Sequence, residues 1–180
     1  FLFDMAFSSS RLPSVIQALD TLSRRVCQAC SALSLVMVVV MLVIVVLRYG
    51  FQMGWIALQE SVTYLHAAVF LLALGYTLQC DGHVRVDVFY RRFSPRKQAM
   101  VNFWGTLLLL IPVCGFLLYY AVPYAADSWA LMETSKEPGG LPLVFVLKSL
   151  IPLGIGILLL QGVSELCRSF LNWRYNTEVQ

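Results

Sequence analysis

Charged side chains are scarce in this sequence. Only 13% of its 180 residues are Asp, Glu, Lys or Arg, whereas 59% are hydrophobic. Soluble domains carry about 25% charged residues, so this composition cannot cover the surface of a water-soluble fold. The net charge is only +3, and no run of Lys or Arg coincides with a soluble fold that could present it to nucleic acid. These shortages exclude a soluble catalytic domain and a nucleic-acid-binding domain.

Histidine is also scarce, with only two copies. His66 lies within an apolar run, and His83 lies in a more polar connecting segment. A haem held between membrane helices by two histidines would therefore lack ligands. We interpret His66 as a hydrogen-bonded packing residue and expect neither a cofactor nor a metal site.

The five cysteines do not form a redox pattern beyond one short motif. Cys27-Gln-Ala-Cys30 has the spacing of a thiol redox pair, but it lies at the expected cytoplasmic end of the first helix, where thiols stay reduced. The other cysteines do not supply the pair of periplasmic dithiols that a membrane thiol oxidase would need. A packing interpretation competes, because four small residues share one helix face and would let another helix approach closely. They are Cys27, Cys30, Ser31 and Ser34. We favour packing over the alternatives, which are a membrane thiol oxidoreductase and a stand-alone channel or cofactor-binding bundle.

Long apolar runs make up most of the chain. They cover residues 26–47, 56–78, 99–126 and 143–166. Each run is long enough to cross a ~30 Å hydrocarbon core as a helix. The sequence therefore predicts an all-α integral membrane protein whose four transmembrane helices form one domain over residues 26–166.

Three segments lie outside these helices. Residues 1–25 are expected to form a cytoplasmic segment, partly an amphipathic helix, because apolar residues recur there at helical spacing. Residues 167–180 are expected to be a cytoplasmic tail. A short amphipathic segment between the first two helices carries Phe51, Met53 and Trp55, and it is expected to lie along the membrane surface.

The distribution of basic residues predicts the orientation. Most of the 13 Lys and Arg residues lie before the first helix, between the second and third, or after the fourth. Short loops rich in Lys and Arg are retained in the cytoplasm, so both termini are predicted to be cytoplasmic. One cluster is also suited to anionic lipid head groups, namely Arg91, Arg92, Arg96 and Lys97. Tryptophans that would anchor helix ends at the interfaces are Trp55, Trp104, Trp129 and Trp173.

Charged residues near the other ends of the helices need partners, because a charge in the membrane is costly unless it is paired or reaches the interface. These residues are Arg48, Glu60 and Lys148. We expect a structural ion pair that joins Glu60 to Lys148 or to Arg48.

Several short motifs occur in order between Arg48 and Leu166. They are Arg48-Tyr49, Trp55 with Glu60, Gly82-His83-Val84-Arg85-Val86-Asp87-Val88-Phe89-Tyr90, Ser94-Pro95-Arg96 and Gly139-Gly140-Leu141-Pro142. The most specific is the succession of glycine, histidine, arginine and aspartate between two transmembrane helices. With four helices and both ends inside, the pattern resembles the DctQ-like small membrane subunit of tripartite ATP-independent periplasmic (TRAP) transporters.

The resemblance implies a scaffold role and no enzymatic activity. In this family a periplasmic substrate-binding protein delivers an organic acid to a large membrane subunit, which imports it with sodium by an elevator movement. The small subunit binds no substrate. It would enlarge and anchor the stationary scaffold in the bacterial inner membrane and help to dock the binding protein. The expected partners are therefore the large permease subunit, the binding protein and membrane phospholipids.

Two groups of residues are candidate contacts for these partners. If the segment after the second helix is extended, three polar side chains share one face and could fix the loop or contact the large subunit; they are His83, Arg85 and Asp87. The loop before the fourth helix offers candidates for contact with the binding protein, with a solvated loop as the alternative; they are Asp127, Glu133, Lys136 and Glu137.

Overall fold

The computed structural model describes residues 11–83, 90 and 92–175, and this part of the chain contains helices and no strand. The elements are α2 (Arg11–Gly50), α3 (Ile56–Leu72), α4 (Leu74–Gln79), α6 (Pro95–Gly105), the π-helical turn η1 (Thr106–Leu110), α7 (Ile111–Ala130) and α8 (Val144–Tyr175). They join into four rods, each long and apolar enough to cross a membrane. The prediction of an all-α protein with four membrane-spanning helices is confirmed.

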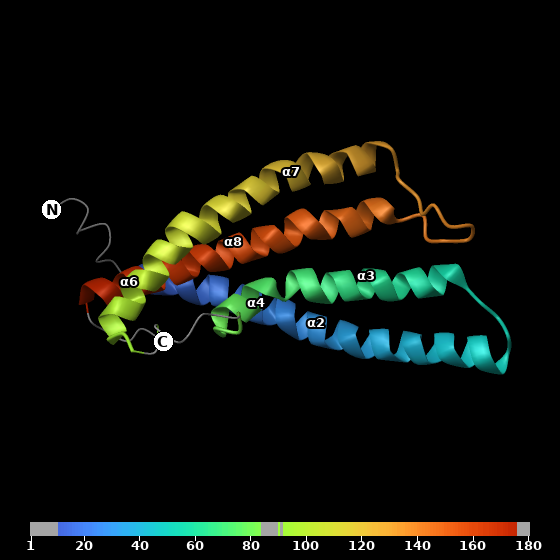
Figure 1. The fold of residues 1–180 in the computed structure, drawn as a ribbon, viewed down its shortest axis with the longest axis horizontal. Helices are drawn as coiled ribbons and strands as arrows, with labels where there is room; N and C mark the ends of the chain where they lie inside the picture. Colours follow the sequence, from blue (N-terminus) through green and yellow to red (C-terminus); the bar gives the residue numbers. More distant parts are fainter. Residues whose placement is uncertain (1–10, 84–89, 91, 176–180) are drawn as a thin grey trace.

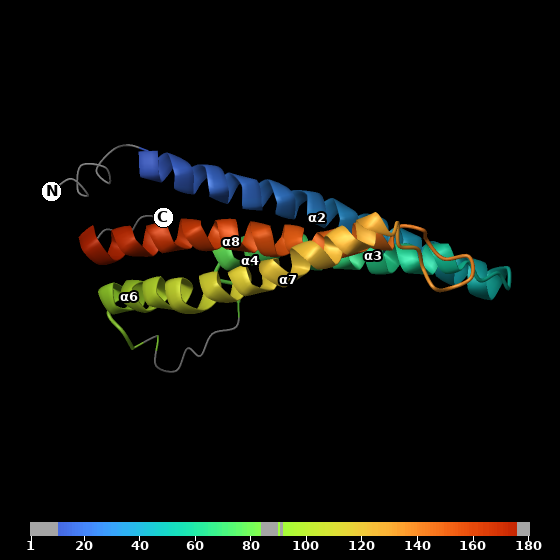
Figure 2. The same ribbon diagram turned by 90° about the horizontal axis from the view of Figure 1, so that it is seen from above.

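The four rods lie side by side, with α8 between α7 and α3 and with α2 on the far side of α3 (Figure 1). The start of α2 and the end of α8 lie at the same end of the molecule, which we call the terminal end. The loops 51–55 and 131–143 lie at the opposite end, which we call the loop end. Helix α8 contacts α2, α3, α4, α6 and α7, and the view from above shows α2 and α6 on opposite sides of it at the terminal end (Figure 2).

Helix α2 is longer than one membrane crossing requires. Its 40 residues extend ~60 Å at 1.5 Å per residue, about twice the hydrocarbon thickness. The amphipathic segment before the first span is thus continuous with the span itself. Ile16, Ser23 and Cys30 are all buried at seven-residue spacing, so one face of α2 packs against the other helices. The connection to α3 is an exposed loop over 51–55 and contains no helix.

The third rod changes direction between α6 and α7, where the π-helical turn η1 separates them (Figure 1). Pro112 follows directly after this turn. Proline lacks an N–H donor, and its ring clashes with the carbonyl four residues earlier, so a regular α-helix cannot continue through it unstrained. The wider π turn accommodates this break within the span.

Small side chains allow α8 to approach its neighbours closely. At Gly154, an added Cβ would lie 2.7 Å from the backbone oxygen of Leu71 in α3. On the other side of α8, Cys114 and Ala121 of α7 form the packed core with Ile155. Lipid tails are as apolar as these side chains, so close packing rather than water exclusion holds the rods together.

We expect Gly154→Ala to destabilise the protein by about 1–3 kcal/mol, because the new methyl group would overlap the backbone of α3. The matched control is Gly156→Ala on the same helix, where an added Cβ meets nothing within 4 Å. That control should be neutral or stabilising, since alanine favours the helix. Thermal unfolding in mild detergent measures both variants. Equal midpoints for the two would contradict the close approach of α8 to α3.

Candidate functional site

The loop 131–143 is tied to the first turns of α3. The Glu60 carboxylate accepts a hydrogen bond from the Leu141 backbone N–H at 2.6 Å and another from the Ser135 hydroxyl. An added Cβ on Gly140 would lie 2.8 Å from Glu60 Oε1, so the loop passes too close for a larger residue there. Glu60 therefore acts as an anchor that fixes the path of this loop.

Lys148 at the start of α8 pairs with Glu133 in the same loop. The Glu133 carboxylate also accepts a hydrogen bond from the buried Ser128 hydroxyl at 2.7 Å, and the Lys148 ammonium lies 4.2 Å from the ring centre of Tyr124. The hydrogen bond from Lys148, followed by that from Ser128, lowers the pKa of Glu133 below its ordinary value. We refer to Glu60, Ser135, Glu133 and Lys148 together as the loop clamp.

The charges at the loop end are arranged differently from the expected ion pair. Within the described residues, Glu60 pairs with neither Lys148 nor Arg48. Glu60 instead accepts hydrogen bonds from donors in the loop. Lys148 pairs with Glu133, which lies 15 residues earlier in the sequence. Both charges are therefore satisfied by the loop.

A second polar cluster joins α2 to α8 near the terminal end. Asp20 Oδ1 accepts hydrogen bonds from Gln161 Nε2 at 2.9 Å and from the Ser164 hydroxyl at 3.0 Å. Its other oxygen pairs with the Arg168 guanidinium, which also donates to Glu165 at 3.1 Å. We call Asp20, Gln161, Ser164 and Arg168 the terminal clamp. It places a paired charge and its hydrogen-bond partners between the first and last helices.

Sequence reasoning missed the terminal clamp, although a signal was present. Gln161, Ser164 and Arg168 recur at helical spacing on one face of α8, and the first two are fully buried. Ser23 of α2 donates a hydrogen bond of 2.6 Å to Gln161 Oε1, which satisfies the buried amide. A polar stripe on an otherwise apolar span predicts a partner helix with matching polar groups.

Two of the four tryptophans connect helices, and three of the four are exposed. Trp129 donates a hydrogen bond of 2.7 Å to the Ser149 hydroxyl and packs on Phe145, so it joins α7 to α8 at the loop end. Trp173 packs against Phe103 and joins α8 to α6 at the terminal end. Exposed indoles available to the membrane interface are those of Trp55, Trp104 and Trp129.

Other predicted contact residues lie at the two ends. Arg85, Asp87 and Arg91 fall outside the described residues, whereas His83 is half-buried beyond the end of α4. Exposed basic residues at the terminal end are Arg92, Arg96 and Lys97. Exposed charged residues at the loop end are Asp127, Lys136 and Glu137.

Residues that could carry redox or metal chemistry do not converge. Cys27 is half-buried and Cys30 is buried on α2, and all five cysteines are free thiols. His66 is exposed on α3 and stacks on Phe70 with ring centres 6.4 Å apart. In the part of the chain that the structure describes, no three His, Cys, Asp or Glu side chains could hold one metal ion.

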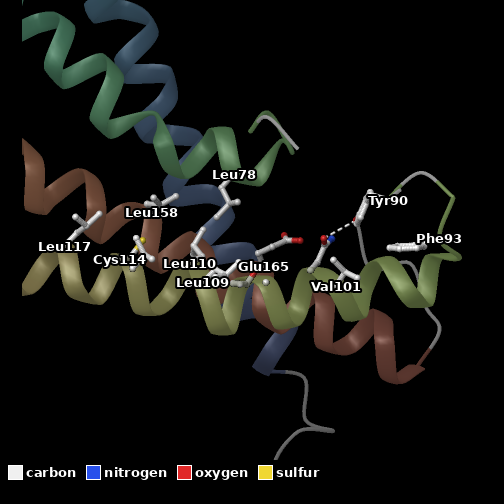
Figure 3. Close-up of a pocket in the computed structure, with 14 residues that line it drawn as sticks. Leu78, Tyr90, Phe93, Val101, Leu109, Leu110, Cys114, Leu117, Leu158 and Glu165 are labelled. Carbon is white, nitrogen blue, oxygen red and sulfur yellow. Dashed lines mark hydrogen bonds between the residues drawn. The ribbon is translucent and has the colours of Figure 1, made fainter. Parts of the chain in front are cut away.

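A groove of about 720 Å³ opens between α4, the rod that contains η1, and α8 (Figure 3). Its lining is mostly apolar. The part farthest from the terminal end includes Cys114, Leu117 and Leu158 (Figure 3). Toward the terminal end the lining becomes polar, because Glu165 points toward a pair formed by the Tyr90 hydroxyl and Asn102 Oδ1, which are 3.1 Å apart.

Asp20→Ala should lower the free energy of unfolding by about 3 kcal/mol, because it removes one of the two carboxylates that pair with Arg168 and leaves the buried Gln161 and Ser164 donors without their acceptor. Gln17→Ala is the matched control, since Gln17 lies nearly one turn earlier on α2 and is exposed. Unfolding in mild detergent, followed by circular dichroism, compares the two variants. Equal stability of both would show that the terminal clamp contributes nothing.

The loop clamp should weaken in acid. The folded state lowers the pKa of Glu133, so its stabilising contribution is present above the ordinary value of 4.5 and is lost as the pH falls below it. Hydrogen exchange of loop 131–143, corrected for the intrinsic pH dependence, should show protection that falls in this range. Glu133→Gln should reduce protection already at neutral pH and flatten the pH profile. A variant profile as steep as that of the wild type would contradict the assignment.

The comparisons with known proteins agree with this architecture. The family model for tripartite ATP-independent periplasmic transporters, DctQ component, matches residues 37–172. No curated protein and no solved structure matches the chain. The matched region includes the second and third rods completely, α8 as far as Asn172, and residues 37–50 of α2. The chain therefore belongs to the DctQ family, a membrane component of tripartite ATP-independent periplasmic transporters.

Proposed function

We propose that this chain is the scaffold subunit of a TRAP transporter in the bacterial inner membrane. It supports the sodium-coupled uptake of an organic acid by anchoring a large elevator-type subunit and by helping to dock a periplasmic binding protein. The observation that carries this proposal is the side-by-side arrangement of the rods, which leaves long apolar flanks exposed (Figure 1). Such flanks suit a subunit that adds width to a membrane complex.

The flanks lie on the outer rods, α2 and α7. On α2, Leu35, Val38 and Leu42 are 71%, 63% and 62% exposed and follow one another at helical spacing. On α7, Phe116 and Tyr119 are 62% and 75% exposed. A partner helix or lipid must cover these side chains in the membrane. An elevator domain moves across the bilayer only if its scaffold resists being carried along, and additional lipid contact supplies that resistance.

The terminal end is assigned to the cytoplasm. Exposed basic side chains gather there on α2 and α6, including Arg24, Arg25, Arg96 and Lys97. The positive-inside rule and the negative surface potential of the cytoplasmic leaflet both favour this orientation. The loop end then faces the periplasm.

The loop 131–143 is proposed to contribute to the docking surface for the binding protein. The loop clamp fixes its backbone, while Lys136 and Glu137 remain exposed. A surface that is already ordered loses less conformational entropy on binding than a flexible one. At the other end, His83, Arg85 and Asp87 are proposed to contact the large subunit or to fix the segment that follows α4.

Purification of the tagged chain from its native membrane in mild detergent tests the proposal. A large polytopic permease should accompany it in a one-to-one ratio, as identified by mass spectrometry. Deletion of the chain should abolish uptake of the organic acid, and expression in trans should restore it. Recovery of the chain alone or as a homo-oligomer in several detergents, together with unchanged uptake after deletion, would refute the scaffold role.

A further inference from the structure

The apolar groove beside η1 continues into a second, polar cavity. This cavity has a volume of about 580 Å³ and shares Tyr90, Asn102 and Glu165 with the groove. Its remaining lining includes Arg96 and Ser94 at the start of α6. The two cavities therefore form one elongated site, apolar in its deeper part and polar where it meets the terminal end.

The groove and the polar cavity together follow most of the third rod. The groove follows it from Val101 to Leu117, which corresponds to ~24 Å at 1.5 Å per residue. The polar cavity adds the stretch from Ser94 to Asn102, so the whole site is longer than half of a bilayer with its head groups, which measures about 20–22 Å. The exposed Trp104 lies beside the polar end, at the depth where indole rings prefer the interface. The site thus has its polar part at the terminal end and its apolar part beside the membrane-spanning helices.

We propose that this site binds one glycerophospholipid of the cytoplasmic leaflet. An acyl chain fills the apolar groove, and the phosphodiester lies in the polar cavity beside the Arg96 guanidinium. Arginine suits this position because its planar donors match phosphate oxygens. The proposal uses the orientation assigned above to choose the leaflet, but it does not depend on the transport role.

A transmembrane helix of a partner fits the site less well. Such a helix needs an apolar path across the whole ~30 Å hydrocarbon core, whereas the groove ends at Leu117. Beyond that point α7 packs directly on α8 through Ala121. Glu165 and Asn102 at the other end would also face an apolar helix, but they are compatible with a polar head group.

The backbone of the third rod helps to shape the groove. The π turn contributes Thr106, Leu109 and Leu110 to its wall, and π turns often occur at binding sites because they change where side chains point. Gly105 also lines the groove, and an added Cβ there meets nothing within 4 Å. A larger side chain at this position would enter the groove and would not collide with the protein itself.

This space allows the site to be blocked selectively. Gly105→Leu places an isobutyl group in the groove, whereas Gly115→Leu is the matched control on α7. Gly115 is also helical and has nothing within 4 Å of an added Cβ, but it does not line the groove. Native mass spectrometry of the full chain in mild detergent, alone and with any co-purified permease, counts the phospholipids that each variant retains.

We expect the wild type and Gly115→Leu to retain one phospholipid and Gly105→Leu to retain about tenfold less. After lipid removal, titration with palmitoyl-oleoyl phosphatidylglycerol, phosphatidylethanolamine and the matching diacylglycerol tests the head group. Both phospholipids should bind more tightly than the diacylglycerol, and Arg96→Gln should weaken their binding by about tenfold while leaving the diacylglycerol unaffected.

Three outcomes would overturn the proposal. The first is equal lipid retention by Gly105→Leu and Gly115→Leu. The second is equal affinity for the diacylglycerol and the phospholipids. The third is loss of the permease from Gly105→Leu with unchanged lipid retention, which would assign the groove to a partner helix. Failure of the permease to co-purify with the wild type, together with unchanged uptake after deletion of the chain, would refute the scaffold role and leave the lipid measurements on the isolated chain valid.

Discussion

The hydrocarbon core of a membrane offers no hydrogen-bond partners, and this constraint determines where the polar groups of this protein lie. Side chains that enter a span must find partners within the protein, or they must be placed where water and head groups reach them. Gln161 and Ser164 follow the first course, since both are fully buried and bonded to Asp20. Lys148 follows the second and meets its carboxylate in a loop. The polar network at each end then fixes how deep the intervening apolar helices lie.

Because the middle of the protein is apolar, the arrangement of its helices depends on how closely their side chains allow them to pack. Helix α8 is the common neighbour of the other rods, so its small residues determine several interfaces together. Gly154 allows α3 to approach, and Gly162 faces Leu110 of η1. The outer rods α2 and α7 each carry buried residues, such as Cys30 and Cys114, and exposed apolar residues, such as Leu35 and Tyr119. The buried residues stabilise the subunit, and the exposed ones remain available for a larger assembly.

Much of the fold could be predicted from the sequence, because length and hydropathy are properties of single segments. Four apolar runs were sufficient to predict four spanning helices, and the motif around Gly82 indicated the family. Pairing between segments is a different kind of property. The sequence showed Glu60 and Lys148 near the same end, but their partners depend on the path of the loop that contains Glu133. The partners of Asp20 were equally hidden, because nothing local to α2 points to α8.

The terminal clamp also bears on how the chain is made. Asp20 and Arg168 are 148 residues apart, and they join the first helix to the last. During synthesis Asp20 is made long before Arg168. Three spans therefore enter the membrane while the Asp20 carboxylate is paired only with solvent. Asp20 precedes the apolar run 26–47, so its charge does not have to enter the hydrocarbon core before Arg168 is available. When α8 is inserted, Arg168 becomes available to Asp20, and the terminal clamp can then hold α2 and α8 together.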